Sequence, residues 1–392
     1  MTGCRLVVAA LLLCTGPAAW SQQTIAPGVT ETSVLFGQSA GLTGPASELG
    51  QAMRLGIQAA FNEANENGGV AGRTLELRSL DDAYEPEAAV ANTRQLIEED
   101  KVFALIGAVG TPTSRAALPV AAAADVPYVA PFTGAELLRT NAPENVINLR
   151  ASYYQETEEL VSHLIADLGI RRIGVMYQED SFGKAGFTGV SQALARRDLE
   201  PSAVSVYRRN TTAVKTGLLD LIAARPDAVI LIGAYEPVAS VIAWADVLDF
   251  EPLMLTISFV GSNALARALG AQRAEGTVVS QVVPFPSADA PDIVVSYRRA
   301  LTSVSSDANP GFVSLEGYLA GRLAVEALER VGANLTRQAF LDGLLKGDDF
   351  DLDGFQVNFS DGDNQGSDEV FLTAIDASGS YRPIDSLEDI AR

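Results

Sequence analysis

Short, uninterrupted runs of apolar residues alternate with amphipathic segments along most of this chain. The run Ala228–Ile232 (AVILI) is an example, and it stands between segments of helical periodicity at 214–224 and 237–248. A strand without a polar face has to be buried on both faces, which is typical of a parallel sheet covered by helices. The alternation therefore predicts an α/β fold.

The alternation runs along the chain twice, and each run is long enough to make a sheet with helices on both sides. The first run has strands expected at 33–38, 74–80, 102–108, 126–131 and 146–150, with helices at 49–65, 86–99 and from about Thr113. The second has strands expected at 172–177, 203–207, 227–232, 253–257 and 276–282, with helices at 155–168, 184–197, 214–224, 237–248 and 262–269. Amphipathic helices at 292–303, 314–331 and 336–344 follow, and then short strands within 349–359 and 369–376.

This order predicts two doubly wound parallel-sheet lobes joined by a multi-strand hinge, because the chain has to pass between the lobes more than once. We expect lobe 1 to contain 28–150 plus 284–348, and lobe 2 to contain 151–283 plus 349–392. A chain of 392 residues is long enough for two such units.

The first 21 residues have the features of a signal peptide. Arg5 is their only charged residue, Leu6–Leu13 is an apolar run, and Ala19–Ser21 offers small residues at the positions that a signal peptidase reads. The apolar run is too short to span a membrane, and nothing later in the chain is long and apolar enough. We therefore expect export to the periplasm, with cleavage near Ser21.

Both cysteines, Cys4 and Cys14, fall within this segment. The mature chain is therefore expected to have no disulfide and no thiol chemistry. Cys14 could instead mark a lipoprotein, although Leu13 before it has the wrong size for that cleavage site. The formal charge of −21 argues against nucleic acid as a partner, because binding nucleic acid requires basic patches.

Two loops in the first run are rich in glycine and threonine at the points where strands end. The segment 110–113 follows one strand and 132–134 follows the next. In an open parallel sheet, small ligands bind where loops leave the carboxyl ends of the strands, and hydroxyls and free amides at a helix start suit a carboxylate. The candidate ligand-binding residues here are Gly110, Thr111, Thr113, Phe132, Thr133 and Gly134. These loops contain no acid, base or thiol, which indicates binding without chemical change.

Aromatic residues follow two strands of the second run. Phe182 comes after the strand at 172–177, and Tyr235, with Glu236 beside it, comes after the strand at 227–232. These aromatic residues are candidates for the opposite wall of a cleft between the lobes, and packing within their own lobe is the alternative.

The segment Gly37–Gly41 matches the G-x-S-x-G pattern of a hydrolase elbow at the end of a strand. That chemistry requires a histidine base, and the one histidine of the chain, His163, lies inside a predicted helix. We interpret the loop as a binding loop, with Gln38 as its candidate contact, and keep a hydrolase that uses Ser39 as an alternative.

Two acidic motifs have structural and functional interpretations. Asp81 and Asp82 end a strand, where they could face a cleft or cap the next connection. The segment 361–366 resembles the start of a calcium loop, but Leu372 stands where a bidentate glutamate should be, which favours a polar turn. No metal site, cofactor motif or catalytic residue is predicted.

Several segments together resemble the Leu/Ile/Val-binding (type I) family of periplasmic solute-binding proteins that serve ABC importers. They are Gly41–Pro45, Asn67–Arg73, Leu105–Gly107, Pro127–Pro131 and Asp180–Gly183. The glycine-rich run before the second strand is the most specific of them, and the resemblance covers nearly all of the mature chain. It implies two lobes joined by three crossovers that close on a ligand like a hinged trap.

The resemblance also implies roles for individual residues. In similar proteins the first-lobe loops bind the ligand carboxylate, which here gives that role to 110–111 and 132–134. An aromatic residue that often covers the ligand is replaced here by Leu49. Phe182 and Tyr235 stand where amino-acid binders usually have tyrosines.

An acid that pairs with the ligand ammonium in such binders would align near Ser262 and Asn263, and this chain has none there. A buried ammonium without a countercharge is costly. The resemblance therefore implies an aliphatic or aromatic carboxylate or an amide, unless Glu236, Glu179 or Asp82 supplies the charge for an amino acid.

We expect a non-enzymatic receptor that captures a small carboxylate-, amide- or amino-acid-like metabolite and delivers it to an ABC permease in the inner membrane. It is expected to be a monomer, to need no cofactor and to have no membrane span. The alternatives are a sensory ligand-binding protein that regulates a receptor or kinase, and the Ser39 hydrolase.

Overall fold

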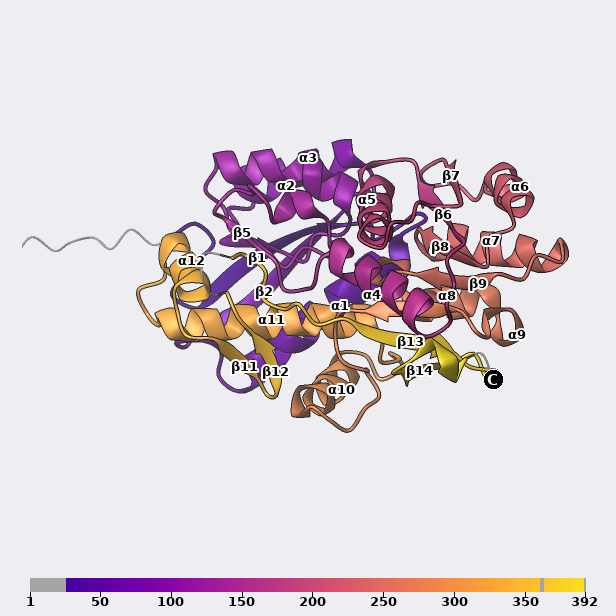
Figure 1. Ribbon diagram of the computed structural model, residues 1–392. Helices are drawn as coiled ribbons and strands as arrows, with labels where there is room; N and C mark the ends of the chain where they lie inside the picture. Colours follow the sequence, from indigo (N-terminus) through magenta and orange to yellow (C-terminus); the bar gives the residue numbers. More distant parts are fainter. Residues whose placement is uncertain (1–25, 360–362, 391–392) are drawn as a thin grey trace, which may run out of the picture.

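The computed structural model describes residues 26–359 and 363–390, and it contains two open sheets, each flanked by helices (Figure 1). The predicted α/β class with two doubly wound lobes is thereby confirmed. The expected signal peptide at 1–21, with Cys4 and Cys14, lies outside the described residues. Among the residues that are described, no helix has both the length and the apolar character needed to cross a membrane.

The first sheet is entirely parallel and has the strand order β2-β1-β3-β4-β5. Its strands are β1 (Ser33–Ala40), β2 (Thr74–Asp81), β3 (Ala104–Ile106), β4 (Tyr128–Val129) and β5 (Val146–Ile147). Helices α2 (Pro86–Glu98) and α3 (Thr111–Ala123) cover one face, and α1 (Ser47–Glu66) and α11 (Phe312–Val331) lie on the other (Figure 1). Helices α10 (Asp292–Val304) and α12 (Arg337–Leu345) pack against α1 and α11 respectively.

The second sheet has the order β14-β13-β10-β9-β8-β6-β7. Five strands are parallel: β6 (Ile173–Gln178), β7 (Ala203–Tyr207), β8 (Ala228–Ile232), β9 (Leu253–Thr256) and β10 (Val278–Gln281). Antiparallel β13 (Phe371–Ile375) and β14 (Tyr381–Ile384) extend one edge. The helices of this lobe are α4 (Tyr153–Ala166), α5 (Ser181–Ala195), α6 (Lys215–Ala224), α7 (Tyr235–Val247), α8 (Ser262–Leu269) and α9 (Ala271–Ala274).

Capping explains why two helices begin earlier than the periodicity of their apolar residues predicts. The carboxylate of Asp180 accepts hydrogen bonds from the backbone N–H groups of Phe182 (2.9 Å) and Gly183 (3.1 Å), so α5 begins at Ser181. The hydroxyl of Ser152 accepts one from the N–H of Gln155, so α4 begins directly after it. A cap satisfies N–H groups that have no partner within the helix, and apolar periodicity alone does not reveal it.

The chain crosses between the two sheets three times: between β5 and α4, between β10 and α10, and between β12 (Phe355–Val357) and β13. The sequence-based boundary at 349 puts the hairpin of β11 (Phe350–Leu352) and β12 in lobe 2, and the structure differs. The hairpin lies on α11, where the Arg330 guanidinium carbon is 3.4 Å from the ring centroid of Phe350. Its inward residues are apolar and buried, so the hairpin is part of the first lobe's core.

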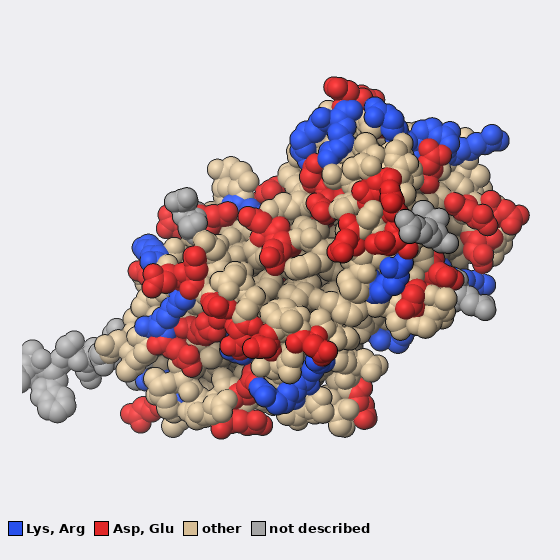
Figure 2. Space-filling model, turned by 60° about the horizontal axis from the view of Figure 1, so that its bottom comes forward, with Lys and Arg blue, Asp and Glu red and all other residues tan. Residues whose placement is uncertain are grey.

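Acidic and basic side chains are mixed on the face that Figure 2 shows, with acidic ones over both halves of the molecule. The chain has a formal charge of −21, and on this face its acidic side chains are not gathered at one end of the molecule. Such a distribution opposes association with other acidic molecules.

Helices α1 and α11 approach so closely that their backbones touch. A Cβ atom added to Gly56 would overlap the carbonyl oxygen of Ser314, and one added to Gly317 would overlap that of Met53. The two glycines therefore allow the contact that joins α11, late in the sequence, to the first lobe.

We predict that Gly56→Ala lowers the free energy of unfolding by about 1–3 kcal/mol, because the added methyl group has no space. Helix propensity alone predicts the opposite sign, a gain of up to about 1 kcal/mol. Denaturant unfolding monitored by circular dichroism measures the change. The control is Asn62→Ala on the exposed side of α1, which should change the value by less than about 0.5 kcal/mol. Stabilisation by Gly56→Ala would contradict the close approach of the helices.

Candidate functional site

The carboxyl ends of the strands of both sheets meet at a cluster of aromatic side chains. Phe259 stands in the short helical turn Ser258–Val260 after β9, and its ring centroid lies 5.4 Å from that of Phe132 and 4.4 Å from that of Phe182. The Tyr84 ring lies 6.1 Å from Phe259, and the Tyr153 ring lies 5.5 Å from Phe182. We call Tyr84, Phe132, Tyr153, Phe182 and Phe259 the aromatic cluster; all five side chains are fully buried.

The first-lobe loops that the sequence analysis assigned to a ligand carboxylate lie beside this cluster. The hydroxyls of Thr111 and Thr133 are 2.7 Å apart and hydrogen-bonded to each other. Thr113 uses its hydroxyl to donate to the carbonyl oxygen of Gly110 (3.0 Å). Gly110 has φ of 100°, and a Cβ there would overlap the Tyr84 ring. The structure thus brings these loop residues together and places Tyr84 on Gly110.

Gly134 allows a second close approach next to these loops. A Cβ at Gly134 would lie 2.6 Å from Cδ1 of Tyr153, so this glycine is where the Tyr153 ring packs. Phe132 and Phe182 are members of the aromatic cluster, and both pack against Phe259. Six of the candidate residues therefore belong to the cluster or lie beside it: Gly110, Thr111, Phe132, Thr133, Gly134 and Phe182.

Gln38 lies elsewhere, and its candidate role is corrected by its hydrogen bonds. Its side-chain amide donates to the carbonyl oxygen of Gly107 (2.9 Å), and its amide oxygen accepts from the hydroxyl of Ser79 (2.8 Å). The side chain is completely buried inside the first lobe. Its amide group therefore holds strand ends of the first lobe together.

The other candidates lie at contacts between the lobes. Leu49 packs against Gly261 of the second lobe, where a Cβ would overlap the leucine side chain. Tyr235 forms a hydrogen bond with Ser47, and this bond lowers the pKa of the tyrosine. Burial has the larger effect, so the pKa of Tyr235 is raised. Asn263 donates to the carbonyl oxygen of Pro310 (3.0 Å).

Ion pairs and hydrogen bonds link the rims of the two lobes. Glu48 at the start of α1 pairs with Arg267 of α8. Arg209, after β7, pairs with Glu85 and also donates to the carbonyl oxygen of Tyr84 at 2.7 Å. Asn210 donates to Glu85 at 2.7 Å. These contacts describe a closed arrangement of the lobes.

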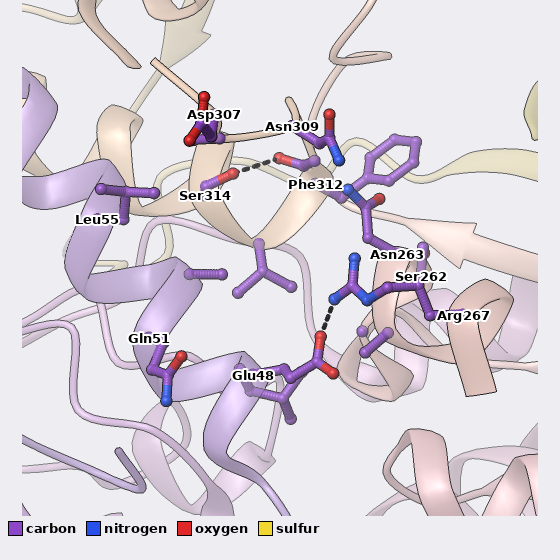
Figure 3. Close-up of a pocket in the computed structure, with 17 residues that line it drawn as sticks. Glu48, Gln51, Leu55, Ser262, Asn263, Arg267, Asp307, Asn309, Phe312 and Ser314 are labelled. Carbon is purple, nitrogen blue, oxygen red and sulfur yellow. Dashed lines mark hydrogen bonds and ion pairs between the residues drawn. The ribbon is translucent and has the colours of Figure 1, made fainter. Parts of the chain in front are cut away.

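Two cavities lie between the lobes next to the start of α1. The larger, of about 480 Å³, lies between the starts of α1, α8 and α11, and we call it the α1 cavity (Figure 3). Leu49 and Asn263 are among its lining residues. The smaller, of about 300 Å³, is lined by Tyr84, Gln178 and Glu236 among others, and we call it the Tyr84 cavity. Both lobes line each cavity, as a site between hinged lobes requires.

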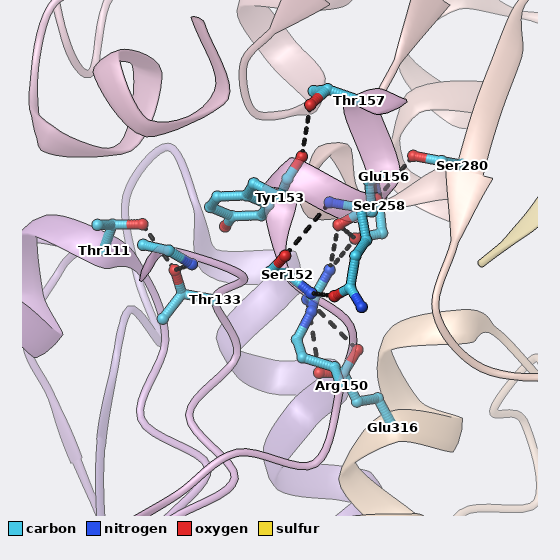
Figure 4. Close-up of polar contacts among 12 residues, drawn as sticks. Thr111, Thr133, Arg150, Ser152, Tyr153, Glu156, Thr157, Ser258, Ser280 and Glu316 are labelled. Carbon is cyan, nitrogen blue, oxygen red and sulfur yellow. Dashed lines mark hydrogen bonds and ion pairs between the residues drawn. The ribbon is translucent and has the colours of Figure 1, made fainter. Parts of the chain in front are cut away.

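A buried charged cluster stands where the chain first crosses between the lobes (Figure 4). The guanidinium of Arg150 lies 2.9 Å from Glu156 of α4 and 3.5 Å from Glu316 of α11. Glu156 also accepts hydrogen bonds from the backbone N–H of Ser258 (2.8 Å) and the hydroxyl of Ser280 (2.7 Å). Burial raises the pKa of Glu316 to about 7, against the attraction of Arg150. The cluster joins both lobes through side chains.

Ser39 and His163 do not form a catalytic pair. The hydroxyl of Ser39 donates to Asp82 at 2.7 Å. His163 contacts Glu159 and Asp167 of its own helix. The elbow-like motif therefore has an aspartate where a hydrolase requires a histidine.

Asp81 and Asp82 both serve the loops that follow β1 and β2, which agrees with their structural interpretation. Asp81 accepts from the N–H of Leu42 (2.8 Å) and from the side chain of Thr43, and Asp82 accepts from the N–H of Tyr84 (2.8 Å). Burial raises the pKa of Asp82 to about 6. Burial also acts on Asp81, but its hydrogen bonds outweigh it, and the pKa of Asp81 is lowered.

The sequence analysis missed six residues that shape this region: Glu48, Tyr84, Arg150, Tyr153, Phe259 and Arg267. Tyr84 and Phe259 follow β2 and β9 and carry the signal that identified Phe182, an aromatic residue just after a strand. No such signal marks Glu48 and Arg267, because their pairing depends on how the lobes meet. Within the described ranges, no group of histidine, cysteine and acidic residues could hold a metal ion.

Comparison with known proteins connects this geometry to a family. The family model described as "Periplasmic binding protein" matches residues 33–380. The Leu/Ile/Val-binding protein BraC3 of Rhizobium johnstonii is 23% identical over 339 residues, 81% of this chain and 85% of that protein.

Two solved structures are similar along nearly their whole length. One is a possible leucine/isoleucine/valine-binding protein from Rhodopirellula baltica, 39% identical, with a TM-score of 0.87 over 92% of this chain and 98% of that chain. The other is a substrate-binding periplasmic protein from Ralstonia solanacearum, 31% identical, with a TM-score of 0.85 over 90% of this chain and 100% of that chain.

We predict that Asp82→Asn removes a pH-dependent loss of stability. The folded-state pKa of about 6 exceeds the unfolded value of 3.8, so the folded state binds more protons and loses stability as the pH rises from about 4 to about 6. The free energy of unfolding of the variant relative to the parent should therefore increase by about 2–3 kcal/mol between pH 4 and pH 7. Urea unfolding at several pH values measures it.

The neighbouring substitution Asp81→Asn is the matched control, and its sign is opposite. The lowered pKa of Asp81 gives stability that is present above the unfolded value and lost as the pH falls. The parent should therefore gain stability relative to Asp81→Asn as the pH rises. Parallel pH profiles for the parent and Asp82→Asn would contradict the assignment.

Proposed function

The chain belongs to the periplasmic binding protein family, and from that membership we propose that it is the extracytoplasmic solute receptor of an ABC importer. It captures a small carboxylate-, amide- or amino-acid-like metabolite between its two lobes. A permease in the inner membrane is the proposed partner, and the periplasm, reached through the signal peptide at 1–21, is the proposed location. The proposed receptor acts as a monomer and catalyses no reaction.

The observation that carries this proposal is that residues from opposite lobes line the same cavities at the carboxyl ends of two sheets. Such a ligand contacts both lobes only when they are closed, so its binding energy shifts the hinge equilibrium toward closure. The rim pairs Glu48–Arg267 and Glu85–Arg209 are contacts of the closed arrangement and act in the same direction.

The ligand class follows from what the walls between the lobes offer. The walls of the α1 cavity and the Tyr84 cavity contain side-chain amides and the hydroxyls of serine and threonine residues, which suit carboxylate and amide groups. One relative named above is a Leu/Ile/Val-binding protein and another is described as a possible one, which supports an amino acid or a compound of similar size. The position of the usual ammonium-binding acid is occupied by Ser262 and Asn263, which supports a ligand without an α-amine.

We predict that a cognate solute raises the melting temperature and contracts the protein. Saturation at about a thousand times the dissociation constant adds roughly 4 kcal/mol and should raise the midpoint by several degrees. A thermal-melt panel of amino acids, aliphatic and aromatic carboxylates and amides is run on refolded, ligand-stripped protein. Small-angle scattering with the best compound should then show a smaller radius of gyration.

The control is a compound of equal charge and size that leaves the melting temperature unchanged, and it should leave the radius unchanged as well. An unchanged radius at saturation by a stabilising ligand would rule out closure as the mechanism. No stabilisation by any compound of the panel would contradict the proposed ligand classes.

A further inference from the structure

The place where the family resemblance puts the ligand carboxylate is filled by this chain's own side chains. The Tyr84 ring lies directly on Gly110, and the hydroxyls of Thr111 and Thr133 bond to each other. Phe259 reaches from the other lobe to stack on Phe132 with an interplanar angle of 29°. A ligand at this position would have to displace buried rings and break a buried hydrogen bond.

The α1 cavity has the space that the centre of the contact does not have. Its volume of about 480 Å³ is in the range of small-molecule sites. Leu55 and Glu48 from α1 face Asn263 and Arg267 from α8 across it, and Phe312 of α11 adds a third side (Figure 3). A molecule bound there contacts both lobes, so its binding favours closure as the proposed function requires.

The walls of this cavity combine an apolar surface with one cationic group and two acidic ones, Glu48 and Asp307. Leu49, Leu55, Phe312 and Val313 supply the apolar surface. Arg267 is the only lysine or arginine among the lining residues of the cavity. The side chain of Arg267 is 58% exposed although it pairs with Glu48, and an exposed ion pair contributes little to stability, so a ligand carboxylate can compete with Glu48 for the guanidinium.

Glu48 would remain in a favourable position after a ligand carboxylate had displaced it from Arg267. Glu48 lies in the first turn of α1, where the positive end of the helix dipole stabilises a carboxylate. A guanidinium binds a carboxylate through two parallel N–H···O hydrogen bonds, which a neutral amide cannot reproduce. The cavity therefore distinguishes a carboxylate from its amide.

From these contacts we propose, on the basis of the proposed receptor function, that the ligand of this protein binds in the α1 cavity and is an amphipathic monocarboxylate. Its carboxylate pairs with Arg267, and its apolar body lies against Leu55, Phe312 and Val313. The aromatic cluster then serves as the closed contact between the lobes and not as the ligand site.

The first experiment compares four ligands that differ only in the head group: octanoate, octanamide, octylammonium and 2-aminooctanoate. Isothermal titration calorimetry on the stripped protein should show octanoate binding at least about tenfold more tightly than octanamide. In Arg267→Met this ratio should fall to about one. A substitution that merely weakened closure would reduce both affinities alike and leave the ratio unchanged.

The matched control is Arg273→Met, which removes an exposed arginine paired with Asp246 outside the cavity. It should leave the octanoate-to-octanamide ratio unchanged. Tighter binding of octylammonium or 2-aminooctanoate than of octanoate would overturn the carboxylate class, and so would an absence of binding by all four.

The second experiment tests the place of binding by filling each cavity in turn. Ala52→Phe fills the α1 cavity and should abolish octanoate binding, whereas Thr212→Phe in the Tyr84 cavity should not change it. Thr133→Val removes a hydroxyl beside the aromatic cluster and should also leave binding intact. Binding that survives Ala52→Phe and is lost in Thr133→Val would overturn the assignment of the site.

Circular dichroism and the melting temperature of the ligand-free variants show whether each is folded. If Ala52→Phe does not fold, the head-group ratio in Arg267→Met remains a test of the same contact. Stabilisation by another class of solute, without any by octanoate, would contradict this inference and leave the receptor function standing.

Discussion

The relative position of the two lobes depends on one buried guanidinium. The side chain of Arg150 is completely inaccessible, as is that of Glu156, and Glu316 is only 3% exposed. A buried charge without a partner is strongly destabilising, so α4 of one lobe and α11 of the other both have to deliver a carboxylate to the same point. The guanidinium also lies 5.1 Å above the ring of Phe132, which contacts Phe259. The buried charged cluster around Arg150 and the aromatic cluster are therefore one continuous unit.

This unit determines where a solute can bind. Rings from both lobes occupy the middle of the contact, and the open volume between the lobes includes the α1 cavity and the Tyr84 cavity. In a hinged receptor, binding energy drives closure only if the ligand contacts both lobes. Both cavities meet this condition because helix starts from opposite lobes line them. Selection between solutes then depends on the few charged groups at the cavity walls, of which Glu48 and Arg267 are a pair.

Several parts of the site could be predicted because parallel strands end at one edge of a sheet. That rule alone brings Gly110, Thr111 and Thr133 together, and it put Phe182 on the facing wall. It failed for Gln38, since a polar residue at a strand end can equally bond to neighbouring strands, as this one does to Gly107. The third crossing was placed too early because the hairpin of β11 and β12 looks like any pair of short strands until its apolar face meets α11.

Apolar periodicity and glycine positions are local properties of the chain, and they were enough to predict the α/β class, the two doubly wound sheets and the loops that face each other. The tertiary structure was needed to show that Tyr84 lies on the loop at Gly110 and that Glu48 meets Arg267. The first contact joins two loops of one lobe, and the second joins residues of different lobes that are far apart in the sequence. Such contacts depend on how loops and lobes pack in space, which no local pattern specifies.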